Sequence, residues 1–266
     1  MKMPEKPQEL NTYLDTHFTC DCGREHYASV KTVRIGAGAL NQLPDVVESL
    51  GYKSLYLISD SITYKIAGQR AMEILESAGV KATIRTLTHA AFDEATVGEL
   101  LIHMPMDTDL VVAVGTGSIN DMSRFFSFRT GRPFMTIATA APMDGFASSV
   151  AALNVENLKT TYNAQPPVAI IGDTDILTGA PSRMIAAGLA DLLGKFTCLC
   201  DWKLAKAINN EHYCPQVVEL VEDCVQTVLK DAPKAQERDP QVIGKIMEGL
   251  VLAGVAMSLY GNSRPA

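Results

Sequence analysis

The sequence predicts an α/β protein in which a parallel sheet covered by helices is followed by an all-helical part. Between about residues 32 and 171, short runs of apolar and β-branched residues alternate with longer runs of helical spacing. Continuous apolar strands separated by helices are typical of a parallel sheet covered on both faces. Beyond Asp173 every apolar run has helical spacing. We therefore place a boundary near residues 173–180.

Each expected element follows from its local pattern. Apolar runs predict strands at residues 32–35, 54–59, 81–87, 110–114, 134–138 and 168–171. Helical spacing predicts four helices in this part of the chain. The first ends near residue 50, the second spans residues 62–78, the third spans residues 94–103, and the fourth begins near residue 118. The C-terminal part is expected to form helices at 184–206, 217–229 and 242–259.

Composition excludes several classes of protein. Thirty acidic against 23 basic residues give a net charge of −7 over 266 residues, which disfavours nucleic acid as a partner. The longest apolar run, residues 249–260, is too short to span a bilayer. The N-terminus lacks the apolar core of a signal peptide, so we expect a cytoplasmic protein. Six cysteines in a chain of this length do not indicate a disulfide framework.

Cys20, Cys22 and His26 lie close together near the N-terminus. Thiol and imidazole groups are possible ligands of a soft metal, but a fourth ligand at the spacing of a zinc site is absent from the neighbouring sequence. We therefore expect a local strand or turn with free thiols.

Two glycine-rich turns after predicted strands compete as phosphate sites. Residues 36–41 (GAGALN) lack the third glycine of the usual dinucleotide fingerprint, which favours a plain tight turn. Residues 111–121 run from a buried strand through Gly115 and Gly117 into a helix that begins near Ser118. Glycines let backbone N–H groups approach a phosphate, and a helix N-terminus adds partial positive charge. We expect this second turn to hold the pyrophosphate of a dinucleotide.

Asp60 ends the second predicted strand. A carboxylate there can accept hydrogen bonds from an adenosine ribose and would repel a 2′-phosphate, so NAD would be preferred to NADP. Asp60 is equally suited to be the N-cap of the following helix.

Residues 136–149 join a strand end to a loop of small residues that contains Asp144. Small side chains at the carboxyl end of a parallel strand permit close approach of a flat ligand, although Asp144-Gly145 is also a common turn pair. Asp191 lies among apolar residues on a predicted helix. Its charge needs a partner, which is either Lys195 four residues later or a divalent metal.

These segments resemble the glycerol-1-phosphate dehydrogenases, in particular the bacterial AraM-like branch. The resembling segments are residues 115–121, 139–149, 171–173, 187–195 and 261–266, in the family's order. The family belongs to the superfamily of glycerol dehydrogenase, iron-containing alcohol dehydrogenases and dehydroquinate synthase. The resemblance implies a Rossmann-like dinucleotide-binding domain over residues 1–176 and a helical metal and substrate domain over 177–266.

The resemblance also implies an activity, namely reduction of dihydroxyacetone phosphate to sn-glycerol 1-phosphate, and its reverse. NAD(H) or NADP(H) would carry the hydride, and one divalent metal (nickel, zinc or iron) would polarise the carbonyl. Asp144 would contact the substrate. Asp191 would bind the metal and act beside the substrate hydroxyls as the catalytic carboxylate. The implied cofactor-binding set is Asp60, Gly115, Gly117, Ser118, Ile119, Asn120, Asp121, Thr139, Ala140, Ala141, Pro142 and Ser148.

One departure from the family concerns the metal. In the family a His-rich stretch follows the segment that matches residues 261–266, and two histidines there complete the metal site; none of the five histidines of this chain stands at such a position. We therefore expect an incomplete helical domain, in which apolar faces such as that of residues 242–259 lack some of their partners and leave hydrophobic surface exposed. Two alternatives stay open: a glycerol dehydrogenase-like enzyme, and a truncated protein that binds a nucleotide without catalysis.

Lys195 and Arg264 are the basic candidates for phosphate recognition. The resemblance also suggests a homodimer and a role in phospholipid metabolism.

Overall fold

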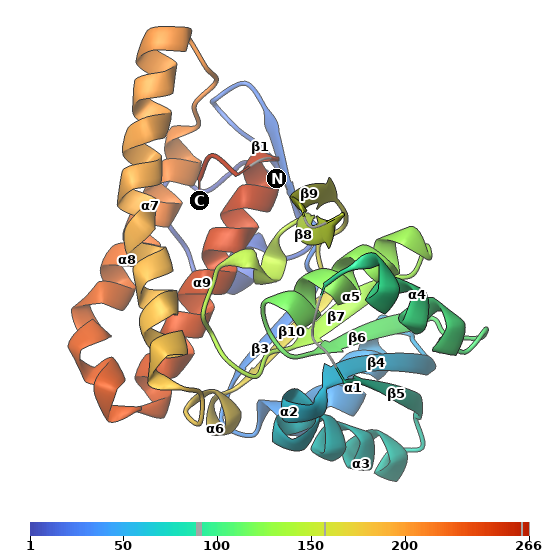
Figure 1. The fold of residues 1–266 in the computed structure, drawn as a ribbon. Coiled ribbons are helices and arrows are strands. Elements are labelled where there is room, and N and C mark those ends of the chain that lie inside the picture. Colours follow the sequence, from blue (N-terminus) through green and yellow to red (C-terminus); the bar gives the residue numbers. More distant parts are fainter. Residues whose placement is uncertain (89–91, 157, 262, 266) are drawn as a thin grey trace.

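The computed structural model describes residues 1–88, 92–156, 158–261 and 263–265. Six parallel strands form the central sheet, side by side in the order β3-β10-β7-β6-β4-β5 (Figure 1). The strands are β3 (Thr32–Gly36), β4 (Ser54–Asp60), β5 (Lys81–Leu87), β6 (Leu110–Val114), β7 (Phe134–Ile137) and β10 (Ala169–Asp173). The predicted α/β class is confirmed, and every predicted strand is present.

Helices cover both faces of the sheet because side chains of a strand alternate between its two sides. Leu55 and Leu57 of β4 pack with α1 (Leu43–Leu50) and α3 (Gln69–Ser77) on one face. Tyr56 and Ile58 pack on the other face with α4 (Glu94–His103) and α5 (Ser118–Arg129). Between β4 and α3 the chain forms α2 (Ser61–Thr63) and a π-helical segment, Tyr64–Gly68.

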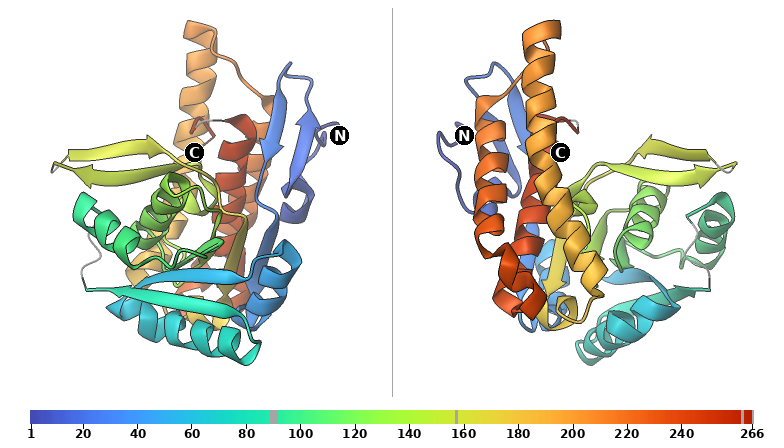
Figure 2. Two further views of the ribbon diagram at one scale, coloured as in Figure 1. Left: turned by 90° about the vertical axis from the view of Figure 1, so that its right-hand side faces the viewer. Right: turned by 60° about the vertical axis from the view of Figure 1, so that its left-hand side comes forward.

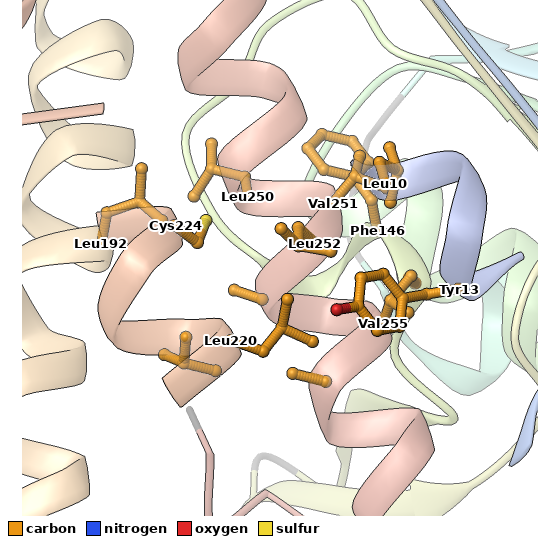
Figure 3. Packing of buried hydrophobic residues seen from close by; sticks show 14 of the residues in the cluster. Leu10, Tyr13, Phe146, Leu192, Leu220, Cys224, Leu250, Val251, Leu252 and Val255 are labelled. Atoms are coloured by element: carbon orange, nitrogen blue, oxygen red, sulfur yellow. The ribbon is translucent and has the colours of Figure 1, made fainter. Parts of the chain in front are cut away.

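Three long helices form the C-terminal layer beside the sheet. After the short α6 (Thr174–Leu177) come α7 (Ser182–Asn209), α8 (Pro215–Asp231) and α9 (Pro240–Tyr260), as the helical spacing predicts. In Figure 3, Leu250 and Val251 of α9 lie between Leu192 of α7, Leu220 of α8 and the N-terminal Tyr13.

The expectation that residues 242–259 would lack partners is wrong. Apart from the half-buried Met257, the apolar side chains of α9 are buried from Val242 to Tyr260, because the N-terminal residues and the loop around Phe146 also pack against it. The exposed large apolar side chains of this layer lie on α7 instead, among them Leu204 and Ile208. By length and composition α9 alone among the described helices could cross a membrane, but 67% of its apolar window is buried, as in the core helix of a folded protein.

Two antiparallel hairpins complete the fold. The N-terminal hairpin pairs β1 (Thr16–Thr19) with β2 (Glu25–Ala28) and stands beside the C-terminal end of α9 (Figure 2). The second pairs β8 (Val150–Val155) with β9 (Leu158–Asn163) and contacts α5. The second hairpin was not predicted from the sequence.

Candidate active site

A cavity of about 680 Å³ lies beside the ends of β4 and β6. Between these two strands, the direction in which the chain adds successive strands to the sheet reverses. The chain passes from β4 outward to β5 and then returns to β6 on the other side of β4. In open parallel sheets such a reversal leaves a crevice at the carboxyl ends of the strands, which is the usual place for a ligand. One wall comes from the ends of β4, β6 and β7 and the other from residues 175–184, at the start of the helical layer. Of the sequence-predicted site residues, the lining contains Asp60, Gly117, Ser118, Ile119, Thr139, Ala140 and Pro142.

The turn between β6 and α5 has a backbone that only glycine adopts readily. Gly117 has φ +49° and ψ −114° as the N-cap of α5. At Gly115 an added Cβ would lie 2.8 Å from Ile119, so the helix packs directly against the turn. The Thr116 hydroxyl is buried and has no hydrogen-bond partner among the described residues. The amides of the first helical turn and this hydroxyl fit a phosphate group in the adjoining cavity.

The other glycine-rich turn is already occupied by a side chain. The carboxylate of Asp173 accepts hydrogen bonds from the backbone N–H groups of Gly38 (3.1 Å) and Leu40 (2.9 Å). Asp173 is itself buried. Its carboxylate takes the amides that a phosphate would need, so the prediction of a plain tight turn at residues 36–41 is confirmed.

Asp60 is the N-cap of α2. Its Oδ1 accepts hydrogen bonds from the backbone N–H groups of Ile62 (2.8 Å) and Thr63 (2.7 Å), and the Asp60 N–H donates in return to the Thr63 hydroxyl oxygen at 3.0 Å. Both capping bonds end on Oδ1, so the cap does not use Oδ2. Asp60 also lines the cavity, and the two roles left open for it are therefore compatible.

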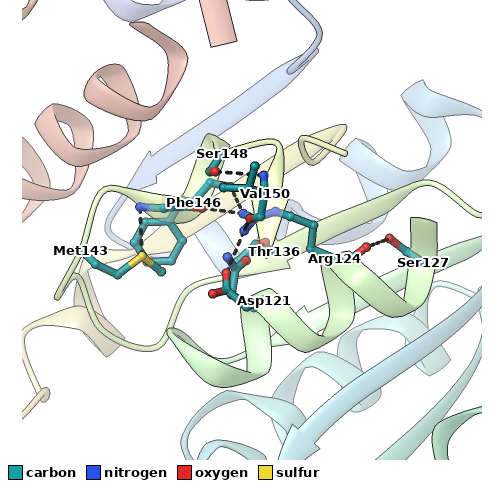
Figure 4. Close-up of polar contacts among 10 residues, drawn as sticks. Asp121, Arg124, Ser127, Thr136, Met143, Phe146, Ser148 and Val150 are labelled. Carbon is teal, nitrogen blue, oxygen red and sulfur yellow. Dashed lines mark hydrogen bonds and ion pairs between the residues drawn. The ribbon is translucent and has the colours of Figure 1, made fainter. Parts of the chain in front are cut away.

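The most consequential residue that sequence reasoning missed is Arg124. Its guanidinium is completely buried and donates hydrogen bonds to the carbonyl oxygens of Gly145 (2.5 Å), Phe146 (3.0 Å) and Val150 (3.0 Å), as Figure 4 illustrates. Asp121 forms an ion pair with it at 2.8 Å. Burial lowers the pKa of Arg124 to about 10, which leaves the guanidinium charged at neutral pH.

Two of the carbonyl partners of Arg124, Gly145 and Phe146, belong to the loop that follows β7, and Val150 begins β8, so Arg124 fixes this loop to α5. Asp121 and Asn120 face protein partners, Asp121 through its ion pair with Arg124 and Asn120 through the Thr136 hydroxyl at 2.7 Å. Neither belongs to the cavity lining, and Gly115, Ala141 and Ser148 are likewise outside it. Ser148 instead accepts a hydrogen bond from the Val150 amide at 3.1 Å.

The backbone of the same loop packs closely against two helices, and at each contact the helix residue is a glycine. A Cβ added at Gly188 of α7 would lie 2.1 Å from the carbonyl oxygen of Ala141. At Gly254 of α9 it would lie 2.6 Å from the carbonyl oxygen of Asp144. Both contacts are with backbone atoms, so neither position accommodates a larger side chain without moving the loop.

Asp144 of this loop forms a charged cluster with Asp191 and Lys195 of α7. Lys195 Nζ lies 2.5 Å from Asp144 and 3.7 Å from Asp191, and its side chain is only 4% exposed. Asp191 also accepts a hydrogen bond from the Asp144 amide at 2.7 Å. Burial raises the pKa of Asp144, and the nearby Lys195 charge opposes that effect.

A catalytic metal at Asp191 does not fit the residues that the structure describes. Such sites normally use three protein ligands, whereas Asp191 has the amide of Asp144 on one oxygen and Lys195 beside the other. Within the described residues, the one group of three or more metal-binding side chains lies elsewhere. His89 falls outside the described residues.

Neither basic candidate for phosphate recognition faces the cavity. Lys195 is held by Asp144 and Asp191, and Arg264 pairs with Glu211 (2.5 Å) and Asp201 (2.6 Å). The cavity lining does contain one cation, Arg183 at the start of α7.

Comparison with known proteins places the chain in a family. Residues 34–181 match the family profile described as iron-containing alcohol dehydrogenase. The chain belongs to the iron-containing alcohol dehydrogenase family. Relatives named glycerol-1-phosphate dehydrogenase (NAD(P)+) include one from Halalkalibacterium halodurans, 34% identical over 93% of this chain and 63% of its own length. Another, from Bacillus velezensis, is 32% identical over 99% of this chain and 67% of its own length.

Solved structures of other dehydrogenases share the fold. An iron-containing alcohol dehydrogenase from Thermotoga maritima superposes with a TM-score of 0.73 over 89% of this chain and 69% of its own, at 16% identity. Glycerol dehydrogenase from Schizosaccharomyces pombe superposes with a TM-score of 0.72 over 86% of this chain and 61% of its own, also at 16% identity. The resemblance that the sequence motifs predict is thus confirmed, while the chain spans about 63% of the length of curated relatives such as that of H. halodurans.

Proposed function

We propose that the protein is an NAD(P)-dependent dehydrogenase that interconverts dihydroxyacetone phosphate and sn-glycerol 1-phosphate. The observation that carries the proposal is the cavity at the reversal of strand order, whose lining joins Asp60, the Gly117 turn and the small residues 139–142. The names of the relatives supply the substrate class. The protein residues would bind and orient the two reactants.

The cofactor-binding roles follow from the lining. The Gly117 turn and the N-terminus of α5 would hold the pyrophosphate. Oδ2 of Asp60, which the helix cap does not use, would accept from a ribose hydroxyl and favour NAD over NADP. Thr139 and Ala140 would let the flat nicotinamide lie close to the sheet edge. When bound in reduced form, the nicotinamide supplies the hydride for the carbonyl carbon, and a proton from solvent completes the alcohol.

At the substrate end, we propose that Asp144 contacts the substrate and that Asp191 is its neighbouring carboxylate. Neither carboxylate belongs to the cavity lining, and Lys195 neutralises Asp144 in a largely buried position. A divalent metal at Asp191 would need further ligands than this chain's described residues provide there.

The test is an assay of the 266-residue chain with dihydroxyacetone phosphate, NADH and added nickel or zinc, run in parallel with glycerol and NAD. Oxidation of NADH that depends on dihydroxyacetone phosphate supports the proposal. Activity with unphosphorylated glycerol at an equal or higher rate would favour the glycerol dehydrogenase alternative.

A second candidate is a protein that binds the nucleotide without catalysis. The shortage of metal ligands around Asp191 favours it. It predicts NADH binding with no turnover under any metal, so turnover by this chain would exclude it. A homodimer, a cytoplasmic location and a role in phospholipid metabolism stay predictions; sedimentation analysis would check the first.

A further inference from the structure

Four metal-binding side chains meet at the far end of the helical layer from the cavity. Cys20 and Cys22 lie in the turn of the N-terminal hairpin, His26 is on β2, and Cys214 directly precedes α8. Their ligand atoms all lie within 4.8 Å of one another. The nearest pairs are Cys20 Sγ–Cys214 Sγ at 3.6 Å, and the sulfurs of Cys22 and Cys214 each 3.3 Å from His26 Nε2.

We propose that Cys20, Cys22, His26 and Cys214 bind a structural zinc ion. In tetrahedral zinc sites the bonds are about 2.3 Å long to sulfur and about 2.0–2.1 Å long to nitrogen. At the tetrahedral angle, two sulfur ligands then lie about 3.8 Å apart, and a sulfur and a nitrogen ligand lie about 3.6 Å apart. The three nearest pairs come close to those separations. Three thiolates and one imidazole are a ligand set typical of closed, structural zinc sites.

The orientation of His26 supports a ligand role. Its Nδ1 lies 2.8 Å from the carbonyl oxygen of Leu259 in α9, and the ring is 1% exposed. A carbonyl oxygen only accepts, so Nδ1 carries the hydrogen and the lone pair of Nε2 faces the sulfurs. Metal-bound histidines are typically oriented by such a bond from the other ring nitrogen.

Backbone groups present partial positive charge to two of the sulfurs. Cys214 is the N-cap of the 17-residue helix α8, whose dipole stabilises a negative charge at that end. The amide of Cys22 lies 3.5 Å from Cys20 Sγ, and Gly23, with φ +86°, completes the turn that brings the two cysteines together.

The site would cross-link segments that are far apart in the chain. His26 and Cys214 are separated by 188 positions, and the Leu259 carbonyl adds the end of α9. All four positions are taken by side chains, so no position is open for substrate. His212 nearby is not a ligand, because its Nε2 donates to the carbonyl oxygen of Cys22 at 3.1 Å. We therefore assign the site a stabilising role, separate from the proposed dehydrogenase site.

The test measures zinc in the 266-residue chain purified without chelators, by elemental mass spectrometry. We expect about one zinc per chain, retained in Cys200→Ser and Asp191→Asn. Cys200 is an exposed cysteine outside the cluster, and Asp191 is the proposed carboxylate of the dehydrogenase site. Cys214→Ser and His26→Gln should lose the zinc. Zinc retained by Cys214→Ser and lost from Asp191→Asn would overturn the proposal.

Cobalt substitution of the wild-type chain keeps the test decisive if the variants fail to fold. Cobalt(II) bound by three thiolates should give the intense absorption bands of tetrahedral thiolate coordination, and chelation should abolish the bands and lower the melting temperature. Wild-type protein that takes up neither metal, or that carries a Cys20–Cys214 disulfide when purified under reducing conditions, would contradict the site.

Discussion

Lys195 Nζ lies 2.5 Å from the carboxylate of Asp144 but 3.7 Å from that of Asp191, although Asp191 is four residues away on the same helix. The closer partner comes from the loop after β7, so this cation fastens α7 to the loop beside the cavity. The local spacing indicates only the pair with Asp191, which is the longer of the two contacts.

Lys195→Met should lower the free energy of unfolding by about 3 kcal/mol, because it leaves the largely buried carboxylate of Asp144 without a cation. Urea unfolding measures the change. Lys203→Met is the matched control, since Lys203 pairs with Glu222 at the surface and should cost less than about 1 kcal/mol. Burial already raises the pKa of Asp144. In the Lys195 variant the loss should therefore be largest above that pKa and shrink as the pH falls through it; equal losses in the two variants would refute the argument.

Arg124→Lys should loosen the loop after β7, because an ammonium group cannot reproduce the several directed bonds of a guanidinium. We expect a loss of stability of about 3 kcal/mol and at least about tenfold weaker NADH binding, or about 1.4 kcal/mol. Thermal melting and calorimetric titration measure the two effects. Arg129→Lys, at an exposed position of the same helix, should change neither.

Gly188→Ala should be strongly destabilising, because the new methyl group meets the Ala141 carbonyl oxygen at 2.1 Å. Gly194→Ala on the same helix is the control. A Cβ there meets nothing within 4 Å, so the better helix propensity of alanine should stabilise the protein by up to about 1 kcal/mol. The midpoints of chemical unfolding should move in opposite directions; an upward shift in both would show that helix propensity alone decides, and a downward shift in both would contradict the contrast between the two sites.

Asp60→Asn should keep the helix cap and remove the negative charge that faces the cavity. We expect little change in melting temperature and a rise in the affinity for NADPH relative to NADH. Asp93→Asn provides the comparison, because Asp93 caps α4 in the same way through the Thr96 amide. An unchanged NADPH to NADH ratio would mean that Asp60 is a cap only.

The strands and helices could be predicted because their signals are local. Residues 110–114 form an unbroken apolar run, and a strand buried on both faces needs such a run. The hairpin of β8 and β9 was not predicted because its alternation of buried and exposed residues is weak, and β9 has no buried residue. Its position depends on packing against α5, which the local pattern does not encode.

The site was predictable where it follows strand ends and not where partners come from distant segments. The Gly117 turn and Asp60 were found because both directly follow apolar strands. By contrast, Asp173 fills the turn at Gly38, 135 positions away, and Cys214 joins His26 across 188 positions. Arg124 resembles an ordinary surface charge in sequence, and only the fold reveals that its partners are carbonyl groups of another segment.

Calorimetric titration of the 266-residue chain with NADH tests the central claim most directly, with Gly117→Ala and Gly131→Ala as the two variants. Both glycines have positive φ, but Gly131 lies in the turn after α5, away from the cavity lining. An alanine in such a backbone costs about 1–3 kcal/mol of stability at either position. We predict that NADH binds the wild type and Gly131→Ala with the same affinity. Its affinity for Gly117→Ala should be at least about tenfold lower, which is a loss of about 1.4 kcal/mol of binding free energy. Equal binding by all three proteins, or none by the wild type, would contradict the dinucleotide site.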